Sequence, residues 1–436
     1  MLQQAHDSDP VGTGVDHLIL YEDAPFQRSH WKLVSGATAG YISDGYTLGV
    51  VGIALAAAQT QLQLTPTWLG AIGSSSLAGL FLGALLSGWG ADRYGRRPIY
   101  AYNMVAFVGL SLLQLAVDSA TQLLIVRFLL GLILGTDYVV CKALLAECTP
   151  RLSRGRCLSL MGVAWAVGYA LAYIVGMYSG DAWRWTLASS AIPALISVPL
   201  RLSAPESPLW LTLAGRHEQA QQVVERYFGS GYGIPTAVAG KSSLRELFNS
   251  HNRAATLVAA TLFFCLVVPY FAVSTFIPQV MAALHVTGNK VAGLIYILGL
   301  MFGSVGGFLV VDWLPRRQFV IGSFAITSVA LLVSSVAQDS SVALSFAVFS
   351  SVLSAAQAQI YVYLPELFPT SLRASGLGIA VAVSRLGAAA GTFLLPLCVA
   401  HLGVSVALYV CTATLILGGI VAFRWAPETR RIHLTR

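Results

Sequence analysis

The stretch GWGADRYGRR, residues 88–97, decides the fold because its charge pattern occurs twice in a chain that is otherwise mostly apolar. In this pattern, an aspartate is followed after four and five residues by two arginines. The first copy consists of Asp92, Arg96 and Arg97, and the second, 220 residues later, consists of Asp312, Arg316 and Arg317. A charged loop that returns after half the length of the chain predicts a duplicated structure.

Two further motifs repeat at nearly the same distance. The spacing E-x-x-P-x-x-x-R occurs with Glu147, Pro150 and Arg154, and again 219 residues later with Glu366, Pro369 and Arg373. The tripeptide at 205–207 (PES) is matched 222 residues later by 427–429 (PET). Because the charges of this repeat lie between apolar stretches, the sequence indicates two similar membrane bundles in tandem.

The composition indicates that most of the chain does not face water. Of its 436 residues, 56% are hydrophobic and 10% are charged, whereas soluble domains carry about 25% charged residues. A helix needs about 20 apolar residues to cross a bilayer, and long uninterrupted runs favour helices over a barrel. We therefore predict an all-α membrane protein with twelve transmembrane helices, at 33–57, 69–90, 98–117, 121–146, 157–179, 183–203, 255–283, 291–311, 318–337, 341–364, 375–399 and 403–425.

The predicted spans divide the chain into two bundles. Residues 1–32 form a polar segment without the features of a cleavable signal peptide. The first bundle covers 33–203, the second covers 254–425, and a linker at 204–253 with a surface helix joins them. A short tail, 426–436, follows the second bundle. The six cysteines show no C-x-x-C spacing, so we expect neither a disulfide nor a metal site.

The net charge of +7 reports orientation rather than an acidic partner. With the amino terminus inside, 21 of the 26 lysines and arginines fall at cytoplasmic positions, including those between 201 and 253. Only Arg184 and Lys290 fall in outer loops. This positive-inside bias predicts that both termini are cytoplasmic and gives no reason to expect nucleic acid binding.

These motifs together resemble the major facilitator superfamily. Residues 88–97 resemble its signature loop, and other motifs are similar to its sugar-porter and metabolite–proton symporter branches, namely those at 127–131, 154–156, 183–185, 205–208, 365–373 and 427–429. The resemblance covers nearly the whole chain and is strongest to bacterial metabolite transporters, which implies the inner membrane of a bacterium as its location. It implies two pseudo-symmetric bundles of six helices, with a substrate bound near the middle of the bilayer and reached alternately from either side.

The resemblance also implies gating roles for the repeated charges. Asp92 is expected to contact the start of the eleventh span near Ser375 and Gly376, because an acid is stabilised at a helix amino terminus. Glu147 is expected to pair with Arg97 and Arg154. The second half supplies the copy of these contacts, in which Glu366 pairs with Arg316 and Arg373. The alternative is that these charges only keep the loops in water.

Five charges lie inside predicted spans, where each costs about 2.5–3.5 kcal/mol on insertion scales: Asp44, Arg127, Asp137, Lys142 and Arg385. Asp44 is similar to the proton-accepting aspartate of related symporters, in which the arginine that Arg127 matches is its partner. A carboxylate beside a cation stays ionised, and moving the cation away lets it accept a proton. The alternative is a permanent ion pair. The second half has no copy of either residue.

Arg385 predicts an anionic substrate. In organic-anion relatives the matching arginine faces the central cavity, and a guanidinium suits a carboxylate; alternatively, Arg385 reaches the cytoplasm or pairs with Glu366. Asp137 resembles an aspartate that borders the cavity in phosphate and metabolite symporters, and Lys142 receives no role. Aromatic and amide side chains complete the set of cavity candidates: Tyr41, Tyr46, Tyr138, Trp165, Tyr270, Gln357, Gln359, Tyr361 and Tyr363.

We therefore expect a proton-coupled symporter that takes up a small organic anion such as a carboxylate or aromatic acid. Its partners are a small-molecule substrate, protons and the lipid bilayer, and we expect a monomer without a cofactor or metal. Three alternatives remain: a proton-driven antiporter that exports a metabolite or drug, a sugar or polyol carrier, and a nutrient sensor that does not transport. No nucleophile–base pair or metal-ligand cluster in the sequence suggests an enzyme.

Overall fold

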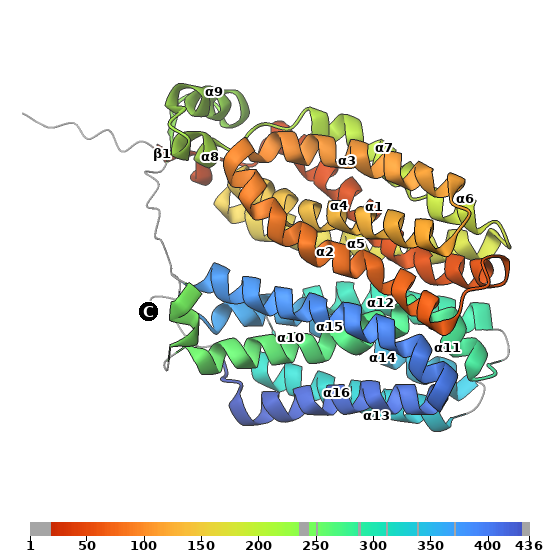
Figure 1. Ribbon diagram of the computed structural model, residues 1–436. Coiled ribbons are helices and arrows are strands. Elements are labelled where there is room, and N and C mark those ends of the chain that lie inside the picture. The colour runs from red at the N-terminus through yellow and green to blue at the C-terminus, as the bar shows by residue number, and fades with distance from the viewer. Residues whose placement is uncertain are drawn as a thin grey trace, which may run out of the picture.

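The computed structural model describes residues 19–234, 244–249, 252–286, 289–310, 313–337, 340–369 and 372–429. Twelve helical spans in these ranges are long and apolar enough to cross a membrane. The prediction of a twelve-helix all-α membrane protein is thereby confirmed. The helices form two bundles that lie side by side, the first half above and the second half below in Figure 1.

The first half begins with five long helices, α1 (Arg28–Gln61), α2 (Pro66–Tyr94), α3 (Arg96–Leu113), α4 (Ala120–Glu147) and α5 (Arg151–Tyr178). The 3₁₀ turn η2 (Gln114–Ala116) extends α3. The sixth span is divided into α6 (Trp183–Ala188) and α7 (Ala191–Leu202). Pro193 explains the break, because it has no N–H to donate to the carbonyl of Ser189 one turn earlier.

The second half contains α10 (Arg253–Thr275), α11 (Ile277–Ala283), α12 (Asn289–Val310), α13 (Arg316–Val336), α14 (Ser340–Glu366), α15 (Arg373–Leu402) and α16 (Val404–Trp425). The sequence predicted a single helix over 255–283, and this is wrong near its end. The helix is interrupted at Phe276, and Pro278 lies in the first turn of α11. Proline fits the first turn of a helix but not its interior.

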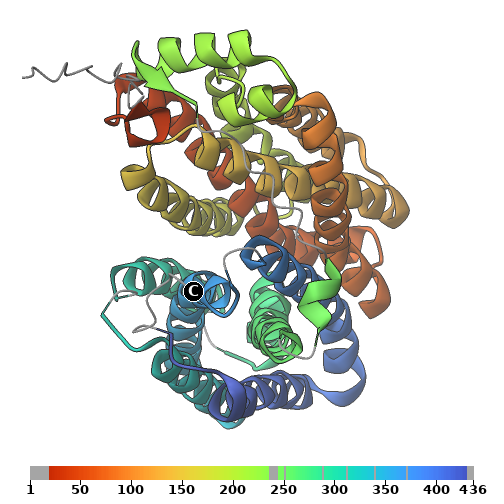
Figure 2. The ribbon, with the colours of Figure 1, turned by 90° about the vertical axis from the view of Figure 1, so that its left-hand side faces the viewer.

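The linker contains the short helix α8 (Pro208–Leu213), the predicted surface helix α9 (His217–Phe228) and the turn η3 (Leu244–Phe248). Strand β1 (Ile19–Leu20) pairs in parallel with β2 (Tyr232–Gly233), and the turn η1 (Tyr21–Asp23) follows β1. The linker helices and the described carboxyl end of the chain lie at one end of the bundles, which we call the linker end; the opposite one is the far end. Figure 2 looks onto the linker end and shows the two halves apart as two groups of helices.

The halves pack closely against each other towards the far end. Gly70, near the start of α2, lies so close to α15 that a side chain there would overlap the carbonyl of Phe393. Similarly, Gly293 of α12 leaves room for the hydroxyl of Tyr173 on α5. The amide of Gln279 donates to the carbonyl of Gly52 across the two halves (3.1 Å). These contacts join the bundles on the side opposite the linker.

Candidate functional site

Aromatic side chains of both halves meet in the middle of the molecule. The indole of Trp165 on α5 lies 6.3 Å from the ring of Tyr270 and 6.4 Å from the ring of Phe271, both on α10. Charged side chains lie beside these rings. We call the whole group the central cluster; its members are Tyr41, Asp44, Asp137, Tyr138, Lys142, Trp165, Arg201, Tyr270, Phe271, Tyr361 and Arg385.

Asp44 is fully buried in α1, and neither of its carboxyl oxygens has a hydrogen-bond partner among the described residues. Its carboxyl group faces that of Asp137 at hydrogen-bonding range, and Arg201 and Lys142 lie within electrostatic range. Two ionised carboxylates can only accept hydrogen bonds. A bond between Asp44 and Asp137 therefore needs a proton on one of them.

Asp137 of α4 is paired with Arg201 of α7, and both side chains are fully buried. The guanidinium donates to both carboxylate oxygens, with 2.9 Å between Nη2 and Oδ2, in a bidentate arrangement. Asn103 donates a further hydrogen bond to Oδ1 (3.3 Å). A side chain at Gly40 of α1 would overlap the guanidinium, so this glycine makes room for the pair.

Arg201 is a correction to the prediction from the sequence, in which it counts as a cytoplasmic charge at the end of the sixth span (183–203). It lies inside α7, one residue before the helix ends, and its side chain extends into the bundle. There it donates to the carbonyl of Gly36 (3.2 Å) and stacks on the ring of Tyr100 (4.4 Å). The small residues Gly36 and Gly40, one turn apart on the first span, are the sequence signal that could have indicated it.

Arg127 and Asp44 do not form the expected ion pair in the described part of the chain. Arg127 is fully buried and donates to the backbone carbonyl of Thr47 on α1 (3.0 Å). The reason is geometric, since Asp44 faces Asp137. Arg127 and Asp137 are ten residues apart on α4, which corresponds to about 15 Å. One carboxyl group cannot meet both residues.

Arg385 of α15 reaches the other half of the molecule. Its guanidinium carbon lies 5.7 Å from the ring centre of Phe271 and 5.9 Å from that of Tyr138 on α4. Its Nη2 donates to the hydroxyl of Tyr361 (3.3 Å). No carboxylate forms an ion pair with it among the described residues, so the predicted pairing with Glu366 is not found there. Arg385 is a buried cation surrounded by aromatic rings.

The other predicted cavity residues differ in their surroundings. Tyr138 and Tyr361 belong to the central cluster, and Gln357 lies at hydrogen-bonding range of Tyr361. Gln359 is buried, and its amide nitrogen has no partner in the described ranges. Tyr46 points elsewhere, because its hydroxyl bonds to that of Ser189 within the first half (2.7 Å).

At the linker end of the first half, Glu206 caps the amino terminus of α3. Its carboxylate accepts hydrogen bonds from the backbone N–H groups of Arg96 (3.0 Å) and Arg97 (3.1 Å). The side chain of Arg96 contacts Asp92 (3.0 Å) and Glu147 (3.4 Å). Carboxylates are stabilised at this position because a helix amino terminus carries partial positive charge.

The second half repeats this arrangement. Glu428 accepts from the backbone N–H groups of Arg316 (3.0 Å) and Arg317 (3.1 Å) at the start of α13. The Nε of Arg316 lies 3.7 Å from Glu366, which also accepts a hydrogen bond from Thr429. Both capping glutamates belong to the repeated tripeptides PES and PET, whose spacing alone gave them no role.

Several expected gating contacts have different partners in the structure. Glu147 pairs with Arg96 rather than Arg97, because neighbouring residues of a helix point about 100° apart. Arg154 pairs with Glu22 (3.3 Å). In addition, Arg373 donates to the carbonyl of Pro365. The side chain of Asp92 is 75% exposed and pairs with Arg96 instead of reaching α15. Asp312 lies outside the described residues. Each of these contacts stays within one half.

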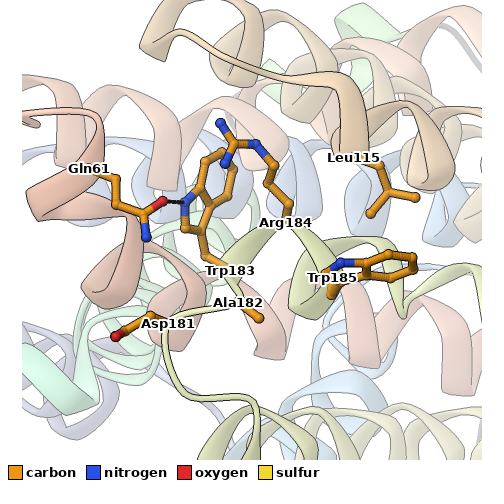
Figure 3. A pocket seen from close by; sticks show the side chains of 7 residues that line it. All are labelled: Gln61, Leu115, Asp181, Ala182, Trp183, Arg184 and Trp185. Atoms are coloured by element: carbon orange, nitrogen blue, oxygen red, sulfur yellow. Dashed lines mark hydrogen bonds between the residues drawn. The ribbon is translucent and has the colours of Figure 1, made fainter.

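A hollow of about 340 Å³ lies beside α6, at the far end of the first half (Figure 1). Figure 3 shows the side chains that line it, none of which belongs to the central cluster. The indole N–H of Trp183 donates to Gln61 (2.8 Å), and Arg184 stacks on the Trp183 ring (4.4 Å). Arg184 also forms an ion pair with Asp118 (3.1 Å). Its cation is therefore already neutralised.

Comparisons with known proteins agree over most of the chain. The family described as "Sugar (and other) transporter" matches residues 33–436. The chain is 37% identical to the inner membrane metabolite transport protein YgcS of Escherichia coli, over 95% of each chain. It is 26% identical to the niacin transporter NiaP of Acinetobacter baylyi, over 88% of this chain and 90% of that one. The inward-open structure of the E. coli xylose transporter XylE superposes with a TM-score of 0.77 at 20% identity, over 93% of this chain and 98% of the other.

Proposed function

The chain belongs to the sugar transporter family of the major facilitator superfamily, and on this basis we propose that it is a symporter that takes up a small organic anion together with a proton. Members of this family are multi-pass membrane transporters rather than enzymes. What remains to be proposed is the class of substrate, the coupling ion and the orientation in the membrane.

The observation that carries the proposal is the buried cation Arg385. Its side chain is 6% exposed and has no carboxylate partner among the described residues. A buried charge without a counter-ion is unfavourable, so the site favours an anion. The surrounding rings of Tyr138 and Phe271 suit the apolar part of an aromatic or aliphatic acid. The relative named as a niacin transporter supports this class, because niacin is an aromatic carboxylic acid.

Asp44 is the proposed proton site. Arg201 neutralises Asp137, whereas Asp44 has no hydrogen-bond partner in the described ranges. A proton on Asp44 would turn the contact between the two carboxyl groups into a hydrogen bond. Release requires only that α1 and α4 shift enough to separate them. In this proposal Arg127 anchors α1 through Thr47 and does not neutralise Asp44.

We place the linker end in the cytoplasm, in accord with the positive-inside bias of the sequence. The halves contact each other near the far end, and the ion pairs found among the described residues of the linker end stay within each half. This arrangement supports access to the central cluster from the cytoplasm. In this proposal the repeated charges act as gates. They would form contacts between the two halves at the linker end in the outward-facing state of the carrier.

Proton movement in proteoliposomes tests the proposal. Vesicles loaded with a pH dye are challenged with a panel of carboxylates, sugars and cationic drugs, and Asp44→Asn is measured in parallel. Acidification of the lumen on addition of a carboxylate, lost in Asp44→Asn, is the expected result. Alkalinisation of a pre-acidified lumen would identify an antiporter instead. Equal proton movement by parent and variant would exclude Asp44 as the proton site.

A further inference from the structure

Lys142 has no role in the function proposed above, yet it lies in the central cluster. Its Nζ is 5.3 Å from the ring centre of Tyr361 and 5.9 Å from those of Tyr41 and Tyr138. Lys142 belongs to α4 of the first half, whereas Tyr361 belongs to α14 of the second. Its side chain is exposed, and no carboxylate pairs with it among the described residues. Cation–π contacts hold the ammonium in place without neutralising it.

Arg385 approaches the same two tyrosines from the other half. Its guanidinium lies 5.9 Å from the Tyr138 ring and donates to the Tyr361 hydroxyl. Two cations, one from each half, therefore flank the same pair of rings. Neither has a carboxylate partner in the described part of the chain, so the space beside the rings favours negative charge.

A charge count of the central cluster indicates how much negative charge it can take. Asp137 and Arg201 cancel each other. Lys142 and Arg385 together contribute two positive charges, and Asp44 contributes one negative charge or none. The cluster is therefore singly positive when Asp44 is ionised and doubly positive when Asp44 carries a proton.

We propose that Lys142 is a second substrate-binding cation and that the site takes an organic dianion, with one acidic group on Arg385 and the other on Lys142. This inference rests on the function proposed above and narrows its substrate class. A dianion is fully balanced only when Asp44 is protonated, so the proton and the dianion favour each other's binding. A monoanion is balanced without the proton, so its coupling to the proton is weaker.

In this proposal the pH dependence of dianion binding comes from protonation of Asp44, which the neighbouring charged and titratable groups influence. The titratable and charged groups that face it are Tyr41 on its own helix, Asp137, Tyr138, Cys141 and Lys142 on α4, and Arg201 on α7.

Because Lys142 and Arg385 belong to different halves, a bound dianion also connects the bundles. Such a bridge draws the halves together around the substrate.

Binding of matched acid pairs to the purified protein in detergent tests the proposal. The probes are benzoate with isophthalate, butyrate with succinate, and hexanoate with adipate, titrated calorimetrically at about pH 6 and about pH 8. In at least one of these pairs, we expect the dianion to bind about tenfold more tightly than the matched monoanion. This ratio of affinities should grow as the pH falls. Lys142→Gln should remove that preference and leave monoanion affinity within about twofold, and Lys142→Arg should keep the preference.

Lys32→Gln, at an exposed lysine of α1 outside the cluster, is the matched control and should bind like the parent. Thermal unfolding of Lys142→Gln, compared with the parent, checks that this variant remains folded. If monoanions bind through Arg385 and Lys142→Gln changes nothing, or weakens both members of a pair equally, the dianion site is refuted and the proposed function stands. If no acid of either class binds the parent, the proposed function fails as well.

Discussion

The two halves of the molecule share a charged framework at the linker end but differ in their interiors. In the first half, Glu206 caps α3 and Arg96 meets Glu147; in the second, Glu428 caps α13 and Arg316 meets Glu366. The residues and their spacing correspond, and so do the contacts. The duplicated framework therefore holds the start of one helix in each bundle, α3 in the first and α13 in the second.

The interiors show no such correspondence. The first half buries two acids and two arginines without any exposure, namely Asp44, Arg127, Asp137 and Arg201. In the middle of the second half, Arg385 faces aromatic rings. The halves therefore share their charged helix caps and ion pairs, whereas the groups proposed for the chemistry differ between them. In the proposal the proton binds to Asp44 of the first half, and the second half supplies Arg385 for an acidic group of the substrate.

The largest effect is expected from Arg201→Gln, because no fully buried ion pair like that of Arg201 and Asp137 occurs among the described residues of the second half. It leaves Asp137 buried without its cation, and breaking a buried ion pair in this way costs about 3–5 kcal/mol of stability. Thermal unfolding in detergent measures it. Adding Asp137→Asn should restore much of the loss, because no buried charge is then left alone. A single variant as stable as the parent would contradict the assignment of Arg201.

Gly40→Ala, on α1, tests the ion pair of Arg201 and Asp137 by changing the helix surface against which Arg201 packs. The added methyl group would overlap the Arg201 guanidinium and displace it from Asp137. Overpacking of this kind costs about 1–3 kcal/mol. The matched control is Gly109→Ala, since nothing lies close to that position and the substitution favours a helix. Equal unfolding temperatures of the two variants would argue against the close approach of α1 and α7.

The two helix caps test the symmetry itself. Glu206→Ala and Glu428→Ala each remove a carboxylate that accepts two backbone hydrogen bonds at a helix amino terminus. Each should cost about 1–2 kcal/mol, and the two losses should be similar. Unfolding of both variants under one condition provides the comparison. A large loss in only one half would mean that the repeated contacts are not equivalent.

The smallest effect is expected from Asp92→Asn. The carboxylate is 75% exposed, and an ion pair so open to water contributes about 0–1 kcal/mol. Stability should barely change. Transport should slow if Asp92 joins the other half in the outward-facing state, and stopped-flow proton uptake measures this. Unchanged stability together with unchanged transport would assign Asp92 to the solvated surface.

The sequence sufficed to predict the duplicated twelve-helix fold, because hydropathy and repeated spacing are visible along the chain. It did not suffice for the partners of the buried charges, which depend on how each helix is rotated about its axis. Arg201 was missed because a cation near a helix end resembles an interfacial anchor. The expected pairing of Glu147 with Arg97 was also wrong, because the sequence does not show that α3 is rotated so that Arg96 faces Glu147.

The division of labour between the halves is tested most directly by comparing Asp44→Asn with Arg385→Gln in proteoliposomes. The acid bound best in the calorimetric panel is followed in two modes, exchange across the membrane without a proton gradient and accumulation driven by one. Asp44→Asn should keep exchange and lose accumulation, whereas Arg385→Gln should lose both. If Asp44→Asn still accumulates the acid, or Arg385→Gln exchanges it as fast as the parent, the proposed division is wrong.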